Sequence, residues 1–145
     1  MVLAQGNVKS MGAGGSTACA ILSEPDPQTG GVLKCWGSNV SGILGNKGVT
    51  VGGSSKDPVF VLYASNGNSM PITTARKVDV GFQHACLINS KNRVRCWGAN
   101  SYGQAGNGGA SSGDYSHAEF VFESANGPHL EGVIDIGLGD HHTCA

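Results

Sequence analysis

One segment of the chain occurs twice. Residues 35–46, with the sequence CWGSNVSGILGN, return 61 positions later as CWGANSYGQAGN at residues 96–107, and seven of the twelve positions are identical. Self-similarity at a fixed period of this length indicates a repeat architecture, in which stacked units bury a shared core. The repetition constrains the fold strongly. It constrains function less, because a repeated scaffold does not specify its ligand.

A second, shorter element recurs three times and gives the number of units. In each copy a glycine lies five residues before a cysteine, with apolar residues one and three positions before the glycine; the copies are residues 11–19, 78–86 and 136–144. We therefore expect a single repeat array over residues 1–145. Its parts are unit one at 11–62, a connector at 63–77, the core of unit two at 78–122 and a truncated start of unit three at 133–145.

The composition argues against several classes of protein. With 24 glycines and 13% charged residues, the chain does not have the composition of a helical protein. The formal charge of -1 argues against binding to nucleic acid or to an anionic membrane through bulk electrostatics. No apolar run approaches the ~20 residues that a membrane span needs. The first residues do not form a signal peptide, so we expect any export signal to lie outside this segment.

One local basic run stands out against this nearly neutral background. Lys91, Arg93 and Arg95 alternate along the chain and lie close in sequence to Arg76 and Lys77. Alternate residues of a strand share a face of the sheet, so the run predicts a basic stripe. We expect this stripe to be a solvated sheet face rather than a phosphate site.

Four short apolar runs flanked by turn residues predict two β-hairpins. The runs are residues 18–22 with 32–36, and 85–88 with 93–97. Residues paired across a hairpin have a constant sum of residue numbers: 54 for Cys19 with Cys35 and for Ile21 with Leu33, and 182 for Cys86 with Cys96 and for Ile88 with Val94. Both hairpins therefore share one register, although their turns differ in length.

This register favours two cross-strand disulfides, Cys19–Cys35 and Cys86–Cys96. The alternative is four buried, reduced thiols, since cysteine packs well as a small apolar residue. Cys144 aligns with Cys19 and Cys86, so we expect its partner in a strand beyond this segment; a free reactive thiol is the alternative. Disulfides favour an oxidising compartment, and we expect an extracellular or periplasmic protein.

The combined pattern is apolar-x-apolar-Gly, then His-x-Cys, then apolar-x-Cys-Trp-Gly-x-Asn, then Gly-x-x-Gly-Asn. It resembles the regulator of chromosome condensation repeat family, and most closely the cysteine-bearing bacterial variety of that repeat. The resemblance implies an all-β fold: a partial β-propeller of four-stranded antiparallel blades, about two blades and the start of a third. Residues 57–61 and 119–122 would supply further strands. Further blades of the same or another chain would be needed to close the ring.

The resemblance also assigns structural roles to the repeated residues. Trp36 and Trp97 would fill the space between neighbouring blades, Gly37 and Gly98 would allow tight turns, and His84 and His142 would serve the packing and hydrogen bonding of the repeat. Exposed aromatic anchors for a ligand are the alternative for the tryptophans.

We expect no metal, no cofactor and no catalytic residues. The His-x-Cys pairs at 84–86 and 142–144 offer two ligand-type residues each, whereas a structural zinc site needs four that converge. Residues 140–143 combine an acid, two histidines and a hydroxyl, but neighbouring residues of a strand point to opposite faces. Residues 39–41 form a glycosylation sequon by pattern.

These observations predict a non-catalytic scaffold or binding module, a piece of a longer secreted protein. It would present loops to a protein or a surface polymer, without nucleic acid and without membrane insertion. The loops that differ between the units are residues 23–31, 47–57, 63–75 and 108–118. One alternative is a propeller that exchanges guanine nucleotides on a small GTPase and associates with chromatin, as the founding members of the resembled family do. Another is the presenting scaffold of a larger enzyme.

Overall fold

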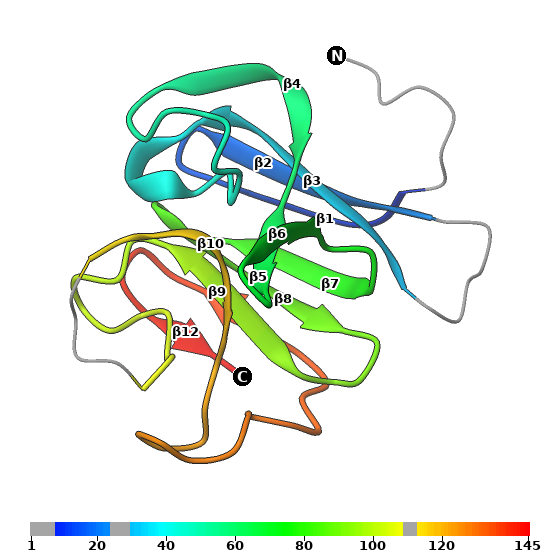
Figure 1. Cartoon of the computed structure of the whole chain (residues 1–145), viewed down its shortest axis with the longest axis vertical. Helices are drawn as coiled ribbons and strands as arrows, with labels where there is room; N and C mark the ends of the chain where they lie inside the picture. Colours follow the sequence, from blue (N-terminus) through cyan, green and yellow to red (C-terminus); the bar gives the residue numbers. More distant parts are fainter. Residues whose placement is uncertain (1–7, 24–29, 109–112) are drawn as a thin grey trace.

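Two antiparallel four-stranded meanders, blade one and blade two, form the body of the molecule (Figure 1). The structure is a computed structural model and describes residues 8–23, 30–108 and 113–145. Blade one consists of β1 (Val8–Gly14), β2 (Thr17–Ser23), β3 (Gly31–Ser38) and β4 (Ser54–Phe60). Blade two consists of β7 (Ala75–Val80), β8 (His84–Asn89), β9 (Val94–Gly98) and β10 (Tyr115–Phe120).

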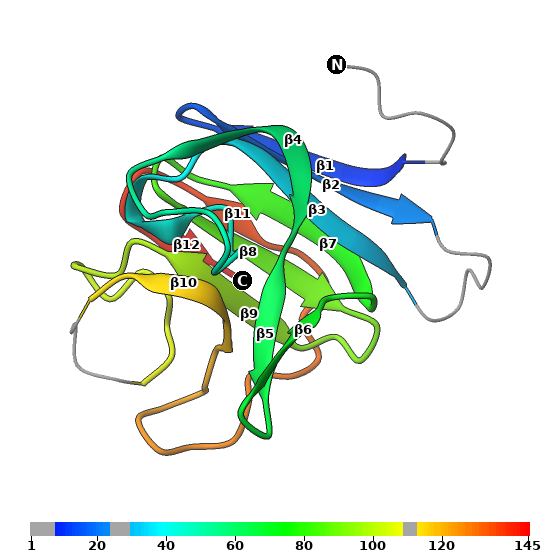
Figure 2. The same ribbon diagram turned by 45° about the horizontal axis from the view of Figure 1, so that its top comes forward.

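Three smaller elements complete the described fold. A short 3-10 helix, η1 (Val40–Gly42), follows β3, and a hairpin of β5 (Leu62–Ser65) and β6 (Asn68–Pro71) links the two blades. The strands β11 (Gly137–Leu138) and β12 (Thr143–Cys144) pair with each other as the start of a third blade. Figure 2 shows β11 and β12 beside the strands of blade two. The all-β, propeller-type fold expected from the sequence is confirmed.

The strand register is the predicted one. Cys19 pairs with Cys35 and Ile21 with Leu33 across β2 and β3, and the corresponding pairs of residues align across β8 and β9. The strands extend one or two residues beyond most of the predicted runs. The segment 63–77, expected as a connector, holds most of the β5–β6 hairpin and the first residues of β7.

Alternation along the strands of blade two divides the core into two layers. Leu87 of β8 and Trp97 of β9 pack with blade one, in a cluster that includes Leu33 and Val61. Other side chains of the same two strands face the other way and pack with Val133 and Ile136 of the third unit: Cys86 and Ile88 of β8, and Val94 and Cys96 of β9. Successive side chains of a strand point to opposite faces, so a repeat with buried residues in adjacent positions is covered on both sides.

The Trp-Gly-x-Asn motif shapes the same loop in both units. Gly37 and Gly98 have φ of 105° and 93°, and a Cβ at either position would collide with the backbone carbonyl of Ser16 or Gln83. Only glycine adopts this conformation without strain. The buried Asn39 accepts a hydrogen bond from the Leu44 amide at 2.9 Å, and Asn100 accepts one from Ala105 at 2.9 Å.

The side chain of Asn39, the asparagine of the sequon, forms hydrogen bonds within this loop. Besides accepting from Leu44, Asn39 donates through Nδ2 to the carbonyls of Val49 at 2.9 Å and Thr50 at 3.1 Å. Its side chain is buried, so the amide nitrogen that a glycan would modify is shielded in the folded chain.

The glycine of the apolar-x-apolar-Gly element is a point of close backbone approach between units. A Cβ on Gly14 would collide with the backbone carbonyl of Gly81, and a Cβ on Gly81 with that of Gly139. Three glycines at equivalent positions of the repeat therefore form a column along which the innermost strands touch. The absence of a side chain is what allows this contact.

Candidate binding groove

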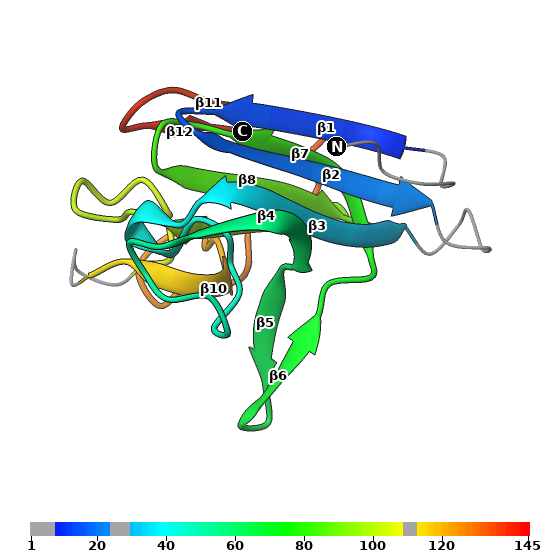
Figure 3. The ribbon, with the colours of Figure 1, turned by 90° about the horizontal axis from the view of Figure 1, so that it is seen from above.

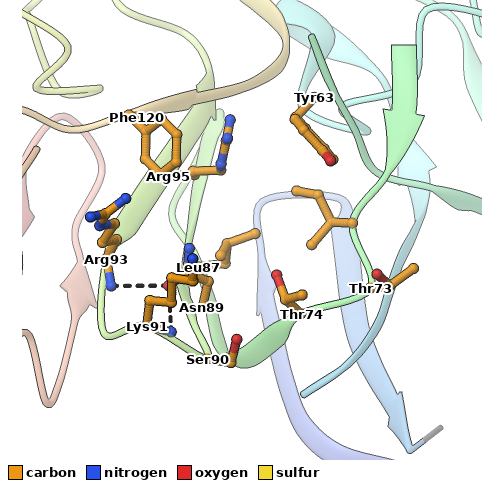
Figure 4. A pocket seen from close by; sticks show the side chains of 11 residues that line it. Tyr63, Thr73, Thr74, Leu87, Asn89, Ser90, Lys91, Arg93, Arg95 and Phe120 are labelled. Atoms are coloured by element: carbon orange, nitrogen blue, oxygen red, sulfur yellow. Dashed lines mark hydrogen bonds between the residues drawn. The ribbon is translucent and has the colours of Figure 1, made fainter. Parts of the chain in front are cut away.

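A groove opens beside the β5–β6 hairpin, which projects away from the two blades (Figure 3). Its cavity has a volume of about 200 Å³. Figure 4 shows the side chains that line it: Tyr63, Ile72, Thr73 and Thr74 from the hairpin and the segment after it, and Leu87, Asn89, Ser90, Lys91, Arg93, Arg95 and Phe120 from blade two. Three of these side chains are cationic and none is a carboxylate.

Arg95 is held between two aromatic rings. Its guanidinium carbon lies 3.5 Å from the centroid of the Phe120 ring and 4.7 Å from that of Tyr63 (Figure 4). Nη1 donates a hydrogen bond to the carbonyl of Ala118 at 2.9 Å. Burial lowers the pKa of Arg95, against the opposing influence of Glu119 and Tyr63. Guanidinium stays protonated in proteins, so the groove holds a fixed, partly desolvated positive charge.

The rest of the basic run surrounds this charge. Asn89 Oδ1 accepts hydrogen bonds from the backbone amides of Lys91 at 2.9 Å and Arg93 at 3.1 Å, which fixes the β8–β9 turn. Arg93 forms an ion pair with Glu131 at 2.5 Å, whereas the side chain of Lys91 is exposed. The expectation of a solvated basic face therefore holds for Lys91 but is wrong for Arg95, because the rings of Tyr63 and Phe120 flank its guanidinium.

Both predicted cysteine pairs are bonded in the structure. The Cα atoms of Cys19 and Cys35 are 4.0 Å apart, and those of Cys86 and Cys96 are 4.1 Å apart. Each disulfide lies on the face of its blade that the next unit covers. Cys144 is a free, exposed cysteine in β12, opposite Gly137.

The two tryptophans are in different surroundings. Trp97 is fully buried between the blades and donates through Nε1 to the carbonyl of Ile43 in blade one at 2.6 Å. Trp36 is adjacent to Cys35, whose side chain faces blade two, so the indole points to the opposite face of blade one. It is partly exposed there.

The histidines differ in the same way. His84 is fully buried, with Nε2 3.0 Å from the hydroxyl of Thr143. Thr143 donates its proton to the carbonyl of Gln104 at 2.9 Å, so the imidazole nitrogen is the donor in the contact with Thr143. Burial lowers the pKa of His84, with a backbone hydrogen bond at His142 opposing that shift. His142 is exposed.

The other candidate features of the sequence can also be located in the described parts of the chain. Within residues 8–23, 30–108 and 113–145, no three His, Cys, Asp or Glu side chains are placed to hold a metal ion. None of the helices in these ranges has the length and apolar content to cross a bilayer. Asp140 and His141 are exposed, whereas Thr143 points into the blade interface. Residues 24–29 and 109–112, within two of the predicted contact loops, lie outside the described residues.

Known proteins share this architecture. Residues 75–104 match the family model described as the regulator of chromosome condensation (RCC1) repeat. A chain in the crystal structure of Kap60 bound to yeast RCC1 (Prp20) superposes with a TM-score of 0.71 at 18% identity, over 99% of this chain and 28% of that one. Human WBSCR16 gives a TM-score of 0.68 at 22% identity, over 99% of this chain and 34% of that one.

A third match is Prp20p from Saccharomyces cerevisiae, studied with its binding to Gsp1p and histones, at a TM-score of 0.66 and 15% identity. This alignment covers 99% of the present chain and 31% of Prp20p. The blades and these similarities define the chain as a β-propeller repeat array. Residues 75–104 carry the similarity to the regulator of chromosome condensation repeat, and the chain spans about a third or less of the length of each similar structure.

Proposed function

We propose that this chain is a non-catalytic β-propeller segment of a longer secreted protein, and that it binds a protein partner. The groove beside the β5–β6 hairpin takes acidic side chains of that partner. The observation that carries this proposal is Arg95, a guanidinium clamped between Tyr63 and Phe120 at the wall of a cavity without carboxylates.

The chemistry of the groove suits a carboxylate. Arginine presents five N–H donors in a planar fork that matches a carboxylate, and Arg95 uses one of them on Ala118. The two rings exclude water from the faces of the guanidinium, which strengthens its interaction with an anion. Lys91 adds a second charge at the rim, and Thr73, Thr74 and Ser90 add hydroxyl groups. An aspartate or glutamate on a partner loop would meet the Arg95 guanidinium, with the other groups around it.

The test is a pair of NMR titrations of the isotope-labelled chain. The probes are acetyl-Gly-Glu-Gly-amide and the matched peptide with glutamine. We expect the glutamate peptide alone to shift the Arg95 side-chain Nε–H signal. Lys91→Gln should weaken that binding by about threefold, since an exposed ion pair contributes less than about 1 kcal/mol.

Lys56→Gln is the control, because it removes the same charge from the exposed face of β4, away from the groove. Equal shifts with both peptides, or equal losses in both variants, would show that the groove does not select a carboxylate. Either result would leave the fold intact and refute the proposed contact.

A second candidate function rests on the structural similarity to Prp20p, which was studied for binding to Gsp1p. In this case the chain would be part of a propeller that binds a small GTPase and exchanges its nucleotide. The two disulfides argue for an oxidising compartment and against this candidate. Thiol mapping of protein purified without reductant separates the two: bonded cysteines favour the secreted module, and five free thiols favour the intracellular one.

A further inference from the structure

The groove beside the β5–β6 hairpin contains a side-chain amide whose orientation is fixed. Asn89, the last residue of β8, lines this groove and is 9% exposed. Its Oδ1 accepts the backbone amides of Lys91 and Arg93, and Figure 4 shows both hydrogen bonds as dashed lines. A backbone N–H only donates, so these contacts identify which end of the Asn89 side chain is the oxygen. The Nδ2 group therefore points away from these two amides.

Nδ2 of Asn89 has no protein acceptor in the described parts of the chain. On the β7 side Asn89 pairs with Ala75, and Leu87, two residues earlier in β8, occupies the same face. On the β9 side Asn89 lies opposite Arg93, and Leu87 lies opposite Arg95. The alanine and leucine side chains have no polar atoms, and a guanidinium only donates. The N–H groups of Asn89 are therefore available to a molecule that enters the groove.

Asn89 and Arg95 are close enough to hold one anion between them. They are diagonal neighbours across β8 and β9, because Leu87 pairs directly with Arg95 and Asn89 lies two residues further along β8. Diagonal neighbours of this kind lie about 7–8 Å apart. A carboxylate has two oxygens, each of which accepts N–H groups at about 2.9 Å, so a single carboxylate can contact both side chains. Arg95 uses one N–H on Ala118, which leaves its other donors for this contact.

We propose that Asn89 is the specificity-determining residue of the groove, and that its Nδ2 group and the Arg95 guanidinium bind one carboxylate between them. This inference rests on the proposed function and names the second donor that the ligand meets. Because the backbone occupies the oxygen of Asn89, the side chain presents only N–H groups to the groove. It therefore selects an acceptor by hydrogen-bond polarity as well as by charge. A ligand amide would place its own NH2 group against a donor.

The test uses one substitution in the groove and a matched one outside it. Asn89→Ser removes the donor but keeps an acceptor for the turn, because a serine hydroxyl also accepts nearby backbone amides. Asn46→Ser is the control. Asn46 Oδ1 accepts the amide of Gly48 at 2.8 Å, at the same two-residue spacing, but its Nδ2 donates to the carbonyl of Phe60 at 2.8 Å. This asparagine follows η1 in blade one and does not line the groove.

We expect the NMR titration with acetyl-Gly-Glu-Gly-amide to shift the side-chain Nδ2–H2 signals of Asn89 together with the Nε–H signal of Arg95. Both should saturate at the same peptide concentration. Asn89→Ser should weaken this binding about tenfold, since a hydrogen bond to a charged group is removed. Asn89→Asp, which puts an acceptor and a negative charge in place of the donor, should abolish it. Asn46→Ser should bind the peptide as the unaltered chain does.

The same titration separates failure of this inference from failure of the proposed function. Saturation of the Arg95 signal with unmoved Asn89 signals, or an unchanged affinity in Asn89→Ser, would overturn the role of Asn89 and leave the proposed function in place. No shift of either signal would refute both. The Asn89 signals are measured in the unaltered chain, so the test remains decisive even if a substitution at this position unfolds the blade.

Discussion

At the scale of single residues, the two tryptophans form a natural matched pair. Trp97 is buried and hydrogen-bonded, whereas Trp36 occupies the same repeat position with only partial burial. We expect Trp97→Ala to lower the free energy of unfolding by about 3–5 kcal/mol, as for other buried aromatic residues. Trp36→Ala should cost no more than about half of that, since less area is buried. Urea denaturation measures both, and equal losses would contradict the assignment of Trp97 to the blade interface.

The buried His84 makes stability depend on pH. Burial lowers its pKa below the ordinary value of 6.5, so the unfolded chain binds a proton more readily than the folded one. Its contribution is complete above pH 6.5 and is lost as the pH falls through 6.5 toward the lowered pKa of the folded state, with a slope of at most about 1.4 kcal/mol per pH unit.

His84→Gln removes this titration, so its unfolding free energy should be lower at neutral pH but flatter below pH 6.5. His141→Gln, at an exposed position, is the control. Denaturation curves at several pH values give the comparison. The same acid slope in His84→Gln as in the unaltered chain would assign the pH dependence to other groups.

At the scale of elements, each disulfide closes one hairpin. The bonded cysteines are separated by 16 residues in blade one and 10 in blade two. Loop-closure entropy then predicts a loss of about 2–3 kcal/mol for each double substitution, Cys19→Ala with Cys35→Ala or Cys86→Ala with Cys96→Ala. Cys144→Ser should change nothing, since its thiol is free. Thermal or urea unfolding without reductant checks this, and a comparable loss in Cys144→Ser would point to an unseen partner.

At the level of elements, the strand register could be predicted from the sequence, whereas the groove could not. The cysteine register was predictable because a hairpin pairs residues by a local count, and the repeat supplied two independent copies. The groove could not be predicted, because it depends on how the β5–β6 hairpin packs against β10 and places Tyr63 beside Arg95. Lys91, Arg93 and Arg95 stood out as a basic run, and residues 63–75 as a variable loop, but no local pattern brings them together. Nothing in the sequence indicated that Tyr63 and Phe120 would flank Arg95.

The exposure of Trp36 and His142 could not be predicted from the sequence either. Each shares its motif with a buried counterpart, so the sequence predicts equal roles. The difference arises from which units flank each blade. Trp97 meets the loop of blade one, and His84 meets β12, whereas the described residues include no unit beyond Trp36 or His142 to cover them.

At the scale of the whole molecule, blade two is the most protected part. Every residue of β8 is buried, because blade one covers one face and the third unit the other. β1 alternates between exposed and partly exposed residues, and Met11 is 64% exposed. Hydrogen exchange should therefore be slowest in β8 and β9 and fastest in β1 and β12. Uniform protection across these strands would show that the array opens only as one cooperative unit.

The column formed by Gly14, Gly81 and Gly139 sets the curvature of the array. Adjacent units touch there backbone to backbone, because an added Cβ would lie 2.2 Å from the Gly81 carbonyl oxygen at Gly14 and 2.5 Å from the Gly139 carbonyl oxygen at Gly81. The angle between one unit and the next therefore depends on two separations. One is the distance between the units at these glycines, where no side chain lies between them, and the other is the distance between their outer parts, where side chains do. A methyl group added at Gly81 would widen the first separation alone and reduce that angle. The number of units that complete a circle is therefore encoded partly in residues that have no side chain.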